Sequence, residues 1–356
     1  MWTFKRIARW LVLSIVTAGL VMGCGLLSGN RSPAPQSTES SASNCRVVKH
    51  NAGETQICGQ PQKVVALSAY TLNLLLSLDQ QPAGYAAPLN IYMGDVFDNP
   101  TQQIPYLGDR VTTQPVNVGQ SGTPSIEKLI ALKPDLIVAE GNRDYELLSK
   151  IAPTLMWQDR GQVGQWRQSL RSLAIALGNE EKAETVIQQY EANVAKARAD
   201  LAESVAAHPK LVLLGSQRLD QGLFAFREDN DLVTLLNEVG FQLASPPAAI
   251  LDLNVPVSVE KLPVFNDADS IIVLGYNRNV DRKQQGSASD SASELMEKSQ
   301  IQSIQEEWEA SAIAQLLTAS QEKRVFFATV YKWYILNPPI GAELVLDQLR
   351  QFFLDN

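Results

Sequence analysis

PSIEKLIALKPDLIVAEGNR, residues 124–143, returns in similar form as VSVEKLPVFNDADSIIVLGYNR, residues 257–278. Each copy has a serine, a β-branched residue, Glu, Lys and Leu, and each continues to an Asp, an apolar run and Asn-Arg. In the first copy IEKLIAL has helical spacing and DLIVAE is typical of a buried strand. An α-β unit that occurs twice predicts two similar lobes within one chain.

The segments around each copy correspond as well. KVVALS (63–68) and a helical TLNLLLSLDQQPAG precede the first copy, and KLVLLGS (210–216) and DLVTLLNEVGF precede the second. Strands that alternate with helices predict mostly parallel sheets in an α/β fold with two Rossmann-like lobes. We expect these lobes at 45–162 and 206–356, the second of them closing with the strand RVFFATV and the helix AELVLDQLRQFFL.

Three shorter segments also carry structural signals: the link between the lobes, the start of one helix and a polar insertion. Residues 163–205 contain two strongly helical stretches, WRQSLRSLAIALG and EEKAETVIQQYEANVAKARADLAES, which predict a linking helix and a following helix. Pro124 suits the first turn of the IEKLIAL helix, with Thr123 as its N-cap. The polar, low-complexity stretch 281–298 predicts a mobile surface insertion.

The N-terminus has the pattern of an export signal. Three cations in MWTFKRIARW precede a short apolar run that ends in Val-Met-Gly-Cys24. This ending resembles a bacterial lipobox, which predicts cleavage after a signal peptide of residues 1–23 and lipidation of Cys24; a plain secretory signal is the alternative. The Ser-, Pro- and Ala-rich residues 24–44 predict a flexible tether.

The charge balance limits the class of partner. The formal net charge of −8 becomes −11 when the three cations of residues 1–23 are removed. A nucleic-acid-binding domain normally carries a basic face, so nucleic acid is not an expected partner.

The two remaining cysteines, Cys45 and Cys58, flank a predicted hairpin with its turn at Asn51-Ala52-Gly53. A hairpin brings its ends close enough for a disulfide, and export favours oxidation. We expect a Cys45–Cys58 disulfide, with free buried thiols as the alternative.

Ligands of parallel sheets bind beyond the carboxyl ends of the strands, so the residues that follow each strand are the candidate ligand contacts. Most of them are aromatic or cationic, which suits an anionic, partly apolar ligand. For any single one, a solvated loop arginine or a core tyrosine is the alternative. The candidates are Ala69, Tyr70, Asn142, Arg143, Tyr145, Gln217, Arg218, Phe224, Phe226, Arg227, Tyr276, Asn277, Arg278, Tyr331, Lys332, Trp333 and Tyr334, together with Arg110 in the loop LGDR.

Signatures of catalysis are absent from the sequence. It contains no GxSxG, HExxH, GxxxxGK[ST] or GxGxxG, and its two histidines, His50 and His208, are expected at the surface. We therefore expect binding rather than enzymatic activity, with no cofactor and no metal ion held by protein side chains.

Several motifs together resemble a known family. An exported lipoprotein with PQKVVAL, Ser-x-Glu-Lys-Leu, Lys-Pro-Asp-Leu-Ile and Ile-Ala-Pro-Thr is similar to the substrate-binding proteins of ABC importers for iron siderophores, haem and cobalamin. The resemblance covers residues 45–356. It implies two α/β lobes bridged by a backbone helix, here 163–178, in a monomer anchored at the outer face of the plasma membrane.

The resemblance also implies a permease dimer as partner. In the family one glutamate on each lobe pairs with permease arginines, and Glu127 and Glu260 match those positions. Both are also first-turn glutamates that favour a helix dipole. We expect them on a different surface from the ligand.

For the ligand, the resemblance and the arginines favour a ferric siderophore of citrate or hydroxamate type. Haem or cobalamin binding remains an alternative, as does a sensor or an enzyme built on the same cleft. The spacing of YKWYILNPPIG (331–341) departs from that of the family. It therefore remains open whether Trp333 or Tyr331 contacts the ligand. The expected contacts are Tyr70, Arg110, Arg143, Arg227, Tyr276, Arg278 and Trp333.

Overall fold

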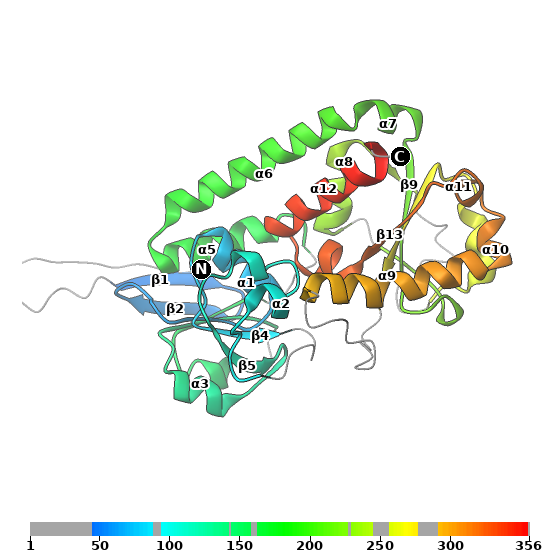
Figure 1. Ribbon diagram of the computed structural model, residues 1–356. Coiled ribbons are helices and arrows are strands. Elements are labelled where there is room, and N and C mark those ends of the chain that lie inside the picture. The colour runs from blue at the N-terminus through cyan, green and yellow to red at the C-terminus, as the bar shows by residue number, and fades with distance from the viewer. Residues whose placement is uncertain are drawn as a thin grey trace, which may run out of the picture. The chain divides into compact units, whose positions relative to one another are not determined.

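The computed structural model describes residues 45–87, 94–141, 144–157, 162–226, 229–244, 256–276 and 291–354 (Figure 1). The predicted signal peptide, the tether and Cys24 lie outside these ranges, so lipidation stays a prediction. Among the residues described, no helix combines the length and apolar character needed to span a membrane.

A six-stranded sheet forms the centre of the first lobe. Five of its strands are parallel and β6 is antiparallel at one edge. Across the sheet the strands are β6 (Thr123–Pro124), β5 (Val116–Gln120), β4 (Gly84–Ala87), β3 (Val64–Ala66), β7 (Leu136–Glu140) and β8 (Thr154–Trp157). The helices of this lobe are α1 (Ala69–Ser77), α2 (Pro100–Gln103), the 3-10 turn η1 (Gly108–Arg110), α3 (Ile126–Leu132) and α4 (Tyr145–Leu148). The predicted strands are apolar throughout because helices cover both faces of a parallel sheet.

The second lobe has its own, smaller sheet. Its strands are β10 (Phe224–Ala225), β9 (Lys210–Ser216), β12 (Ser270–Gly275) and β13 (Val325–Thr329), with β11 (Gln242–Leu243) also paired to β9. Only β10 pairs antiparallel among these strands. The other elements are η2 (Leu219–Gln221), α8 (Asp231–Val239), η4 (Val259–Phe265), α9 (Ala292–Ala310), α10 (Ala312–Gln315), α11 (Thr318–Gln321), the π-helix η6 (Tyr331–Ile335) and α12 (Ile340–Leu354). The predicted α/β class with mostly parallel sheets is confirmed.

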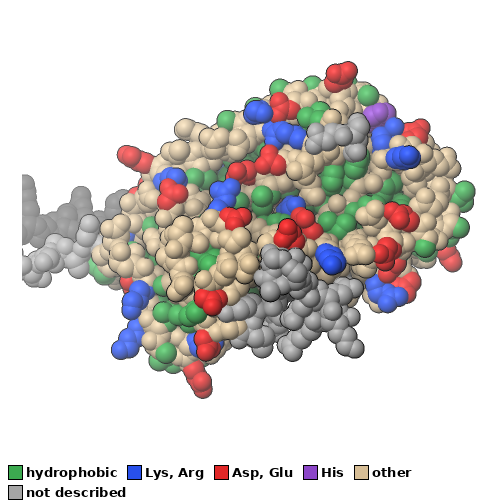
Figure 2. Space-filling model, in the orientation of Figure 1, with side chains coloured by type: hydrophobic (Ala, Val, Ile, Leu, Met, Phe, Trp, Pro, Cys, Tyr) green, Lys and Arg blue, Asp and Glu red, His purple; other side chains and the backbone are tan. Residues whose placement is uncertain are grey.

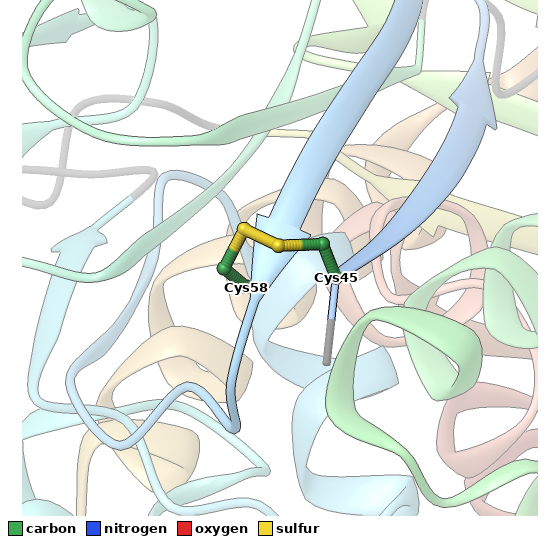
Figure 3. The surroundings of a disulfide bond; sticks show 2 residues. All are labelled: Cys45 and Cys58. Atoms are coloured by element: carbon green, nitrogen blue, oxygen red, sulfur yellow. A yellow bond between two sulfur atoms is a disulfide. The ribbon is translucent and has the colours of Figure 1, made fainter. Parts of the chain in front are cut away.

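The N-terminal hairpin consists of β1 (Cys45–His50) and β2 (Gly53–Cys58). A disulfide of 2.04 Å joins Cys45 and Cys58 at its open end (Figure 3). Arg46 next to it donates from Nε and Nη2 to the carbonyl oxygen of Ala176, at 3.2 and 2.7 Å. These bonds attach the hairpin to the end of α5 (Gln165–Leu177).

The connecting helix differs from the expected one. The predicted bridge at 163–178 contains α5, which packs on β1 and α1 of the first lobe, so the prediction that this segment bridges the lobes is wrong. The bridge is α6 (Glu180–Asp200), which extends from α5 to α7 (Ala202–Ala207) and packs against α8 and α12 (Figure 1). Gly178, at φ 69°, ends α5 and allows the chain to turn into α6.

The two copies of the repeated motif start alike but fold differently. Ser125 caps α3, with its Oγ accepting from the N–H of Lys128, and Ser258 caps η4, with its Oγ accepting from the N–H of Glu260. In an α-helix the ring of Pro263 would clash with the carbonyl group four residues earlier, which disfavours an α-helix here; η4 is a 3-10 helix. The predictions of Thr123 as N-cap and of Pro124 in the first helical turn are wrong, because both residues lie in β6, paired with Gln120 and Gly119.

The predicted mobile insertion at 281–298 is wrong for its final part. Ser291 and Glu294 form a capping box that starts α9, and both Ala292 and Met296 are fully buried. Residues 281–290 lie outside the described ranges.

One buried amide joins elements far apart in the sequence. Asn73 of α1 is fully buried, and its Nδ2 donates to the carbonyl oxygens of Leu336, Asn337 and Pro338 at 2.7, 2.9 and 3.1 Å. Its Oδ1 accepts from the N–H of Ile340 at 3.1 Å. The amide thereby satisfies the polar backbone between η6 and α12, which would otherwise be buried without partners.

We expect Asn73→Ala to lower the free energy of unfolding by about 3 kcal/mol, because it leaves several buried backbone groups unsatisfied. Urea denaturation followed by circular dichroism measures this change. Gln189→Ala is the control, since it removes only an exposed side-chain bond to Asn193 and should cost below about 0.5 kcal/mol. Equal stability of the two variants would contradict the role given to Asn73.

Candidate functional site

The carboxyl edge of the second sheet carries the described candidates of the second lobe. Strands β9, β12 and β13 end here at Ser216, Gly275 and Thr329. Tyr276 directly follows β12, and its backbone N–H donates to the carbonyl oxygen of Ser216 at 2.9 Å. The half-buried Tyr276 therefore begins at the edge where ligands of parallel sheets bind.

An aromatic pair lies at the same edge. The rings of Phe226 and Tyr334 meet edge to face with centroids 5.3 Å apart, and 38% of Tyr334 is exposed. A Cβ on Gly215 of β9 would lie only 3.2 Å from the Phe226 ring, so the glycine makes room for this aromatic. The pair offers an apolar surface beside the polar strand ends.

Tyr106 reaches this edge from the first lobe. Its hydroxyl lies 3.1 Å from Oγ1 of Thr329, and its backbone N–H donates to Oγ of Ser293 at 2.7 Å. Burial, and next the nearby carboxylate of Glu297, raise the pKa of the Tyr106 phenol well above its ordinary value, so the hydroxyl stays protonated. Tyr106 therefore contributes a neutral hydroxyl to the end of β13.

A partly buried ion pair completes the site. Nζ of Lys332, in η6, lies 2.6 Å from Oε1 of Glu297 in α9 and 4.9 Å from the centroid of the Tyr106 ring. The Lys332 side chain is 13% exposed and that of Glu297 is 37% exposed. The Lys332 cation thus lies between a carboxylate and an aromatic face, an arrangement that stabilises a charge with reduced access to water.

The structure places the described members of the seven predicted ligand contacts in different environments. Arg143, Arg227 and Arg278 lie outside the described residues, and Tyr276 lies at the edge described above. Arg110 forms an ion pair of 2.9 Å with Glu343 of α12, which joins the first lobe to the last helix.

Tyr70 and Trp333 lie in the hydrophobic core. Tyr70 is 3% exposed in the first turn of α1. Trp333 is 2% exposed, its indole stacks on Phe352, and its N–H donates to Oε1 of Gln348 at 2.7 Å. Neither side chain offers a ligand appreciable surface in this structure, and the buried alternative Tyr331 does not either. The residue of this segment that is accessible is Tyr334.

The sequence did not predict Tyr106 as a site residue, and it did not single out Lys332 among the expected contacts. Lys332 stood among the residues after RVFFATV, but nothing in the sequence separates it from its neighbours. Tyr106 precedes the LGDR loop and meets Thr329 only through a contact spanning 223 residues. A pattern read along the chain cannot detect such a contact.

The predicted docking glutamates are both exposed and sit in the first turn of α3 and η4. Within the described ranges neither carboxylate has an ion-pair partner. The N–H of Ser125 bonds to Val118 of β5, and Val257 pairs with Leu223 beside β10. Both first turns therefore start near the carboxyl edges of their sheets, and the expectation that the glutamates occupy a different surface from the ligand stays a prediction.

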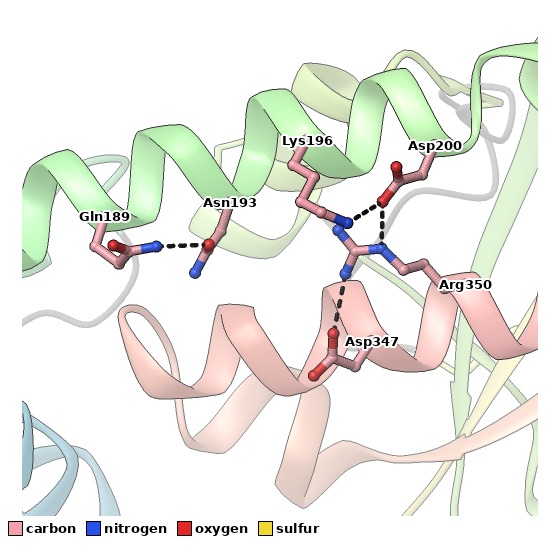
Figure 4. Close-up of polar contacts among 6 residues, drawn as sticks. All are labelled: Gln189, Asn193, Lys196, Asp200, Asp347 and Arg350. Atoms are coloured by element: carbon pink, nitrogen blue, oxygen red, sulfur yellow. Dashed lines mark hydrogen bonds and ion pairs between the residues drawn. The ribbon is translucent and has the colours of Figure 1, made fainter.

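A separate pocket of about 280 Å³ lies between α6 and α12. Lys196 and Arg350 both bond to Oδ2 of Asp200, at 2.9 and 2.8 Å, and Arg350 also bonds to Asp347 (Figure 4). The hydrogen bonds from Lys196 and then Arg350 lower the pKa of Asp200. These ion pairs join α6 to α12, so the pocket lies at a helix–helix contact and away from the strand ends.

The two histidines show no arrangement for metal binding. Nε2 of His50 lies 2.9 Å from Oγ1 of Thr55, and its ring packs 5.4 Å from that of Tyr145, so His50 is half-buried rather than a surface residue. In the described part of the chain, no three His, Cys, Asp or Glu side chains are grouped so that they could hold a metal ion.

Acidic and basic side chains are interspersed on the face drawn in Figure 2.

Comparison with known proteins identifies the family. The chain belongs to the periplasmic binding protein family, whose model matches residues 64–330. It is 27% identical over 279 residues to the putative ABC transporter substrate-binding lipoprotein YhfQ of Bacillus subtilis, covering 74% of this chain and 77% of that protein. It is 24% identical to the Fe(3+) dicitrate-binding periplasmic protein FecB of Escherichia coli, covering 82% and 85%.

A solved structure shows the same architecture. The crystal structure of Staphylococcus aureus SirA complexed with staphyloferrin B aligns with a TM-score of 0.63 and 25% identity, covering 86% of this chain and 98% of SirA. The predicted resemblance to the binding proteins of metal-chelate importers is confirmed.

Trp333 and Tyr334 permit a direct test of which side chain faces the ligand. We expect Trp333→Phe to lower the free energy of unfolding by about 1–2 kcal/mol, through the lost bond to Gln348, while ligand affinity stays constant. Tyr334→Ala should do the reverse, weakening binding with little loss of stability. Calorimetric titration and urea denaturation measure the two effects; a loss of affinity in the Trp333 variant alone would contradict this assignment.

Proposed function

We propose that this chain is a lipid-anchored substrate-binding protein that captures a ferric siderophore of citrate or hydroxamate type and delivers it to an ABC permease for iron uptake. The observation that carries the proposal is the family match over residues 64–330, combined with an aromatic and cationic sheet edge. Relatives whose names specify ferric dicitrate and siderophore complexes support this class of ligand. Iron is cargo here, held by its chelator.

The described residues suit such a ligand chemically. Siderophore complexes present metal-bound oxygens on a partly apolar frame. The rings of Phe226, Tyr334 and Tyr276 provide apolar contact, while Lys332 and the hydroxyl of Tyr106 provide hydrogen bonds to oxygen. Binding requires no bond to be made or broken by the protein.

Delivery requires a permease, and the glutamates supply a contact for it. Glu127 and Glu260 are exposed on separate lobes, each near the carboxyl edge of its sheet. Two equivalent carboxylates suit a two-subunit permease that carries basic side chains. Lipidation of Cys24 followed by the tether 24–44 would hold the protein at the outer face of the membrane, within reach of that permease.

The ligand class is tested by titrating the purified protein with ferric citrate, a ferric hydroxamate, haem and cobalamin, using calorimetry and tryptophan fluorescence. We expect micromolar or tighter binding of a ferric siderophore and weaker binding of the iron-free chelator. Binding of haem or cobalamin alone would overturn the ligand assignment. Turnover of a bound chelate by the protein would indicate an enzyme instead.

Permease docking is tested separately by the double variant Glu127→Arg/Glu260→Arg. We expect iron uptake by cells to fall at least about tenfold because two charge pairs are replaced by repulsion, with ligand affinity unchanged. The control is Glu54→Arg/Glu309→Arg, which reverses one exposed glutamate in the N-terminal hairpin and one in α9 and should leave uptake intact. Normal uptake by the first variant would exclude docking by these glutamates and favour a sensor that does not engage a permease.

A further inference from the structure

Lys332 is positioned unusually for a lysine. It lies three residues beyond Thr329, the last residue of β13, and only 13% of its side chain is exposed. A lysine rarely accepts such burial without a specific partner, since desolvating an ammonium is costly. Its backbone N–H donates to Oγ1 of Thr329 at 3.1 Å, which fixes the start of the side chain at the strand end.

Tyr106, the neighbour of this lysine, has a strained backbone. Its φ of 59° lies in the left-handed region, which bulky residues seldom occupy. The backbone bond to Ser293 and the contact of the hydroxyl with Thr329 hold this conformation. Strain of this kind concentrates at ligand sites, where surrounding contacts impose it. The strained residue places its ring against the Lys332 ammonium.

The ammonium retains capacity to bind a further oxygen. It has three N–H donors, and Glu297 accepts from one of them at 2.6 Å. The Tyr106 ring faces the cation without using a donor in a conventional hydrogen bond. Glu297 is more exposed than Lys332, so the carboxylate lies on the solvent side of the pair.

We infer that Lys332 is the cation that recognises a carboxylate-bearing ferric chelate, and that Glu297 opposes this recognition and so sets how much negative charge the ligand must carry. This inference rests on the proposed function and specifies its ligand. A ligand carboxylate gains a charge-assisted hydrogen bond from Lys332 but is repelled by Glu297. An uncharged hydroxamate complex experiences neither effect strongly.

Substitutions of the two partners of the ion pair should therefore change the affinity for ferric citrate in opposite directions. Lys332→Gln should weaken ferric citrate binding about tenfold or more, the usual loss for a hydrogen bond to a charged group. Glu297→Gln should tighten it several-fold. Lys332→Arg, which keeps the charge, should retain affinity. Lys182→Gln is the matched control, because it breaks a comparable ion pair with Asp79 elsewhere and should change nothing.

The experiment titrates ferric citrate and an uncharged ferric trihydroxamate into the full chain and each variant by calorimetry, with melting curves to verify folding. The inference is supported if Lys332→Gln weakens and Glu297→Gln tightens the affinity for ferric citrate, while neither changes the affinity for the trihydroxamate. Parallel weakening in both variants, or unchanged affinity in Lys332→Gln, overturns it and identifies a structural ion pair. Should Lys332→Gln fail to fold, the sign of the Glu297→Gln effect still decides.

The wild-type protein separates this inference from the proposed function. Wild-type binding of the uncharged trihydroxamate but not of ferric citrate overturns the charge recognition and leaves siderophore binding standing. Wild-type binding of no ferric chelate overturns both.

Discussion

The amide of Asn73 ties α1 of the first lobe to the segment between η6 and α12. It binds three carbonyl groups and one N–H of the segment between η6 and α12, across more than 260 residues of sequence. That segment directly follows Lys332 and Tyr334. Because an amide has both donors and acceptors, a single side chain satisfies a turn that would otherwise be buried at high cost. Tyr106 and Arg110 add two more contacts from the first lobe to residues 329–343.

The geometry of an α-β unit explains how one repeated motif would serve both proposed roles, ligand binding and permease docking. A helix between parallel strands runs antiparallel to them, so its first turn and the carboxyl ends of the strands fall at the same edge of the sheet. Glu127 and Glu260 start such helices, and the ligand candidates follow the strands. A permease that contacts the glutamates would then meet the protein at the edge from which the ligand must leave, which suits transfer.

Local sequence patterns predicted the regular elements well where the elements are continuous. KLVLLGS forms β9 over the same residues, and DLVTLLNEVGF contains α8. The patterns failed where a distant partner decides the conformation. Residues 291–298 are polar in composition, yet they form the start of α9 because Met296 packs into the core. The choice of α6 over α5 as the bridge likewise depends on what each helix packs against.

By itself the sequence determined two α/β lobes, a hairpin with paired cysteines and the motifs of the family, because hydrophobic period, turn residues and short motifs are local properties. Only the tertiary structure decided which aromatic and charged side chains meet. It buries Tyr70 and Trp333, pairs Arg110 with Glu343, and brings Tyr106 to Lys332. The reason is that burial and charge pairing depend on neighbours contributed by remote segments, and a position in the sequence does not specify those neighbours.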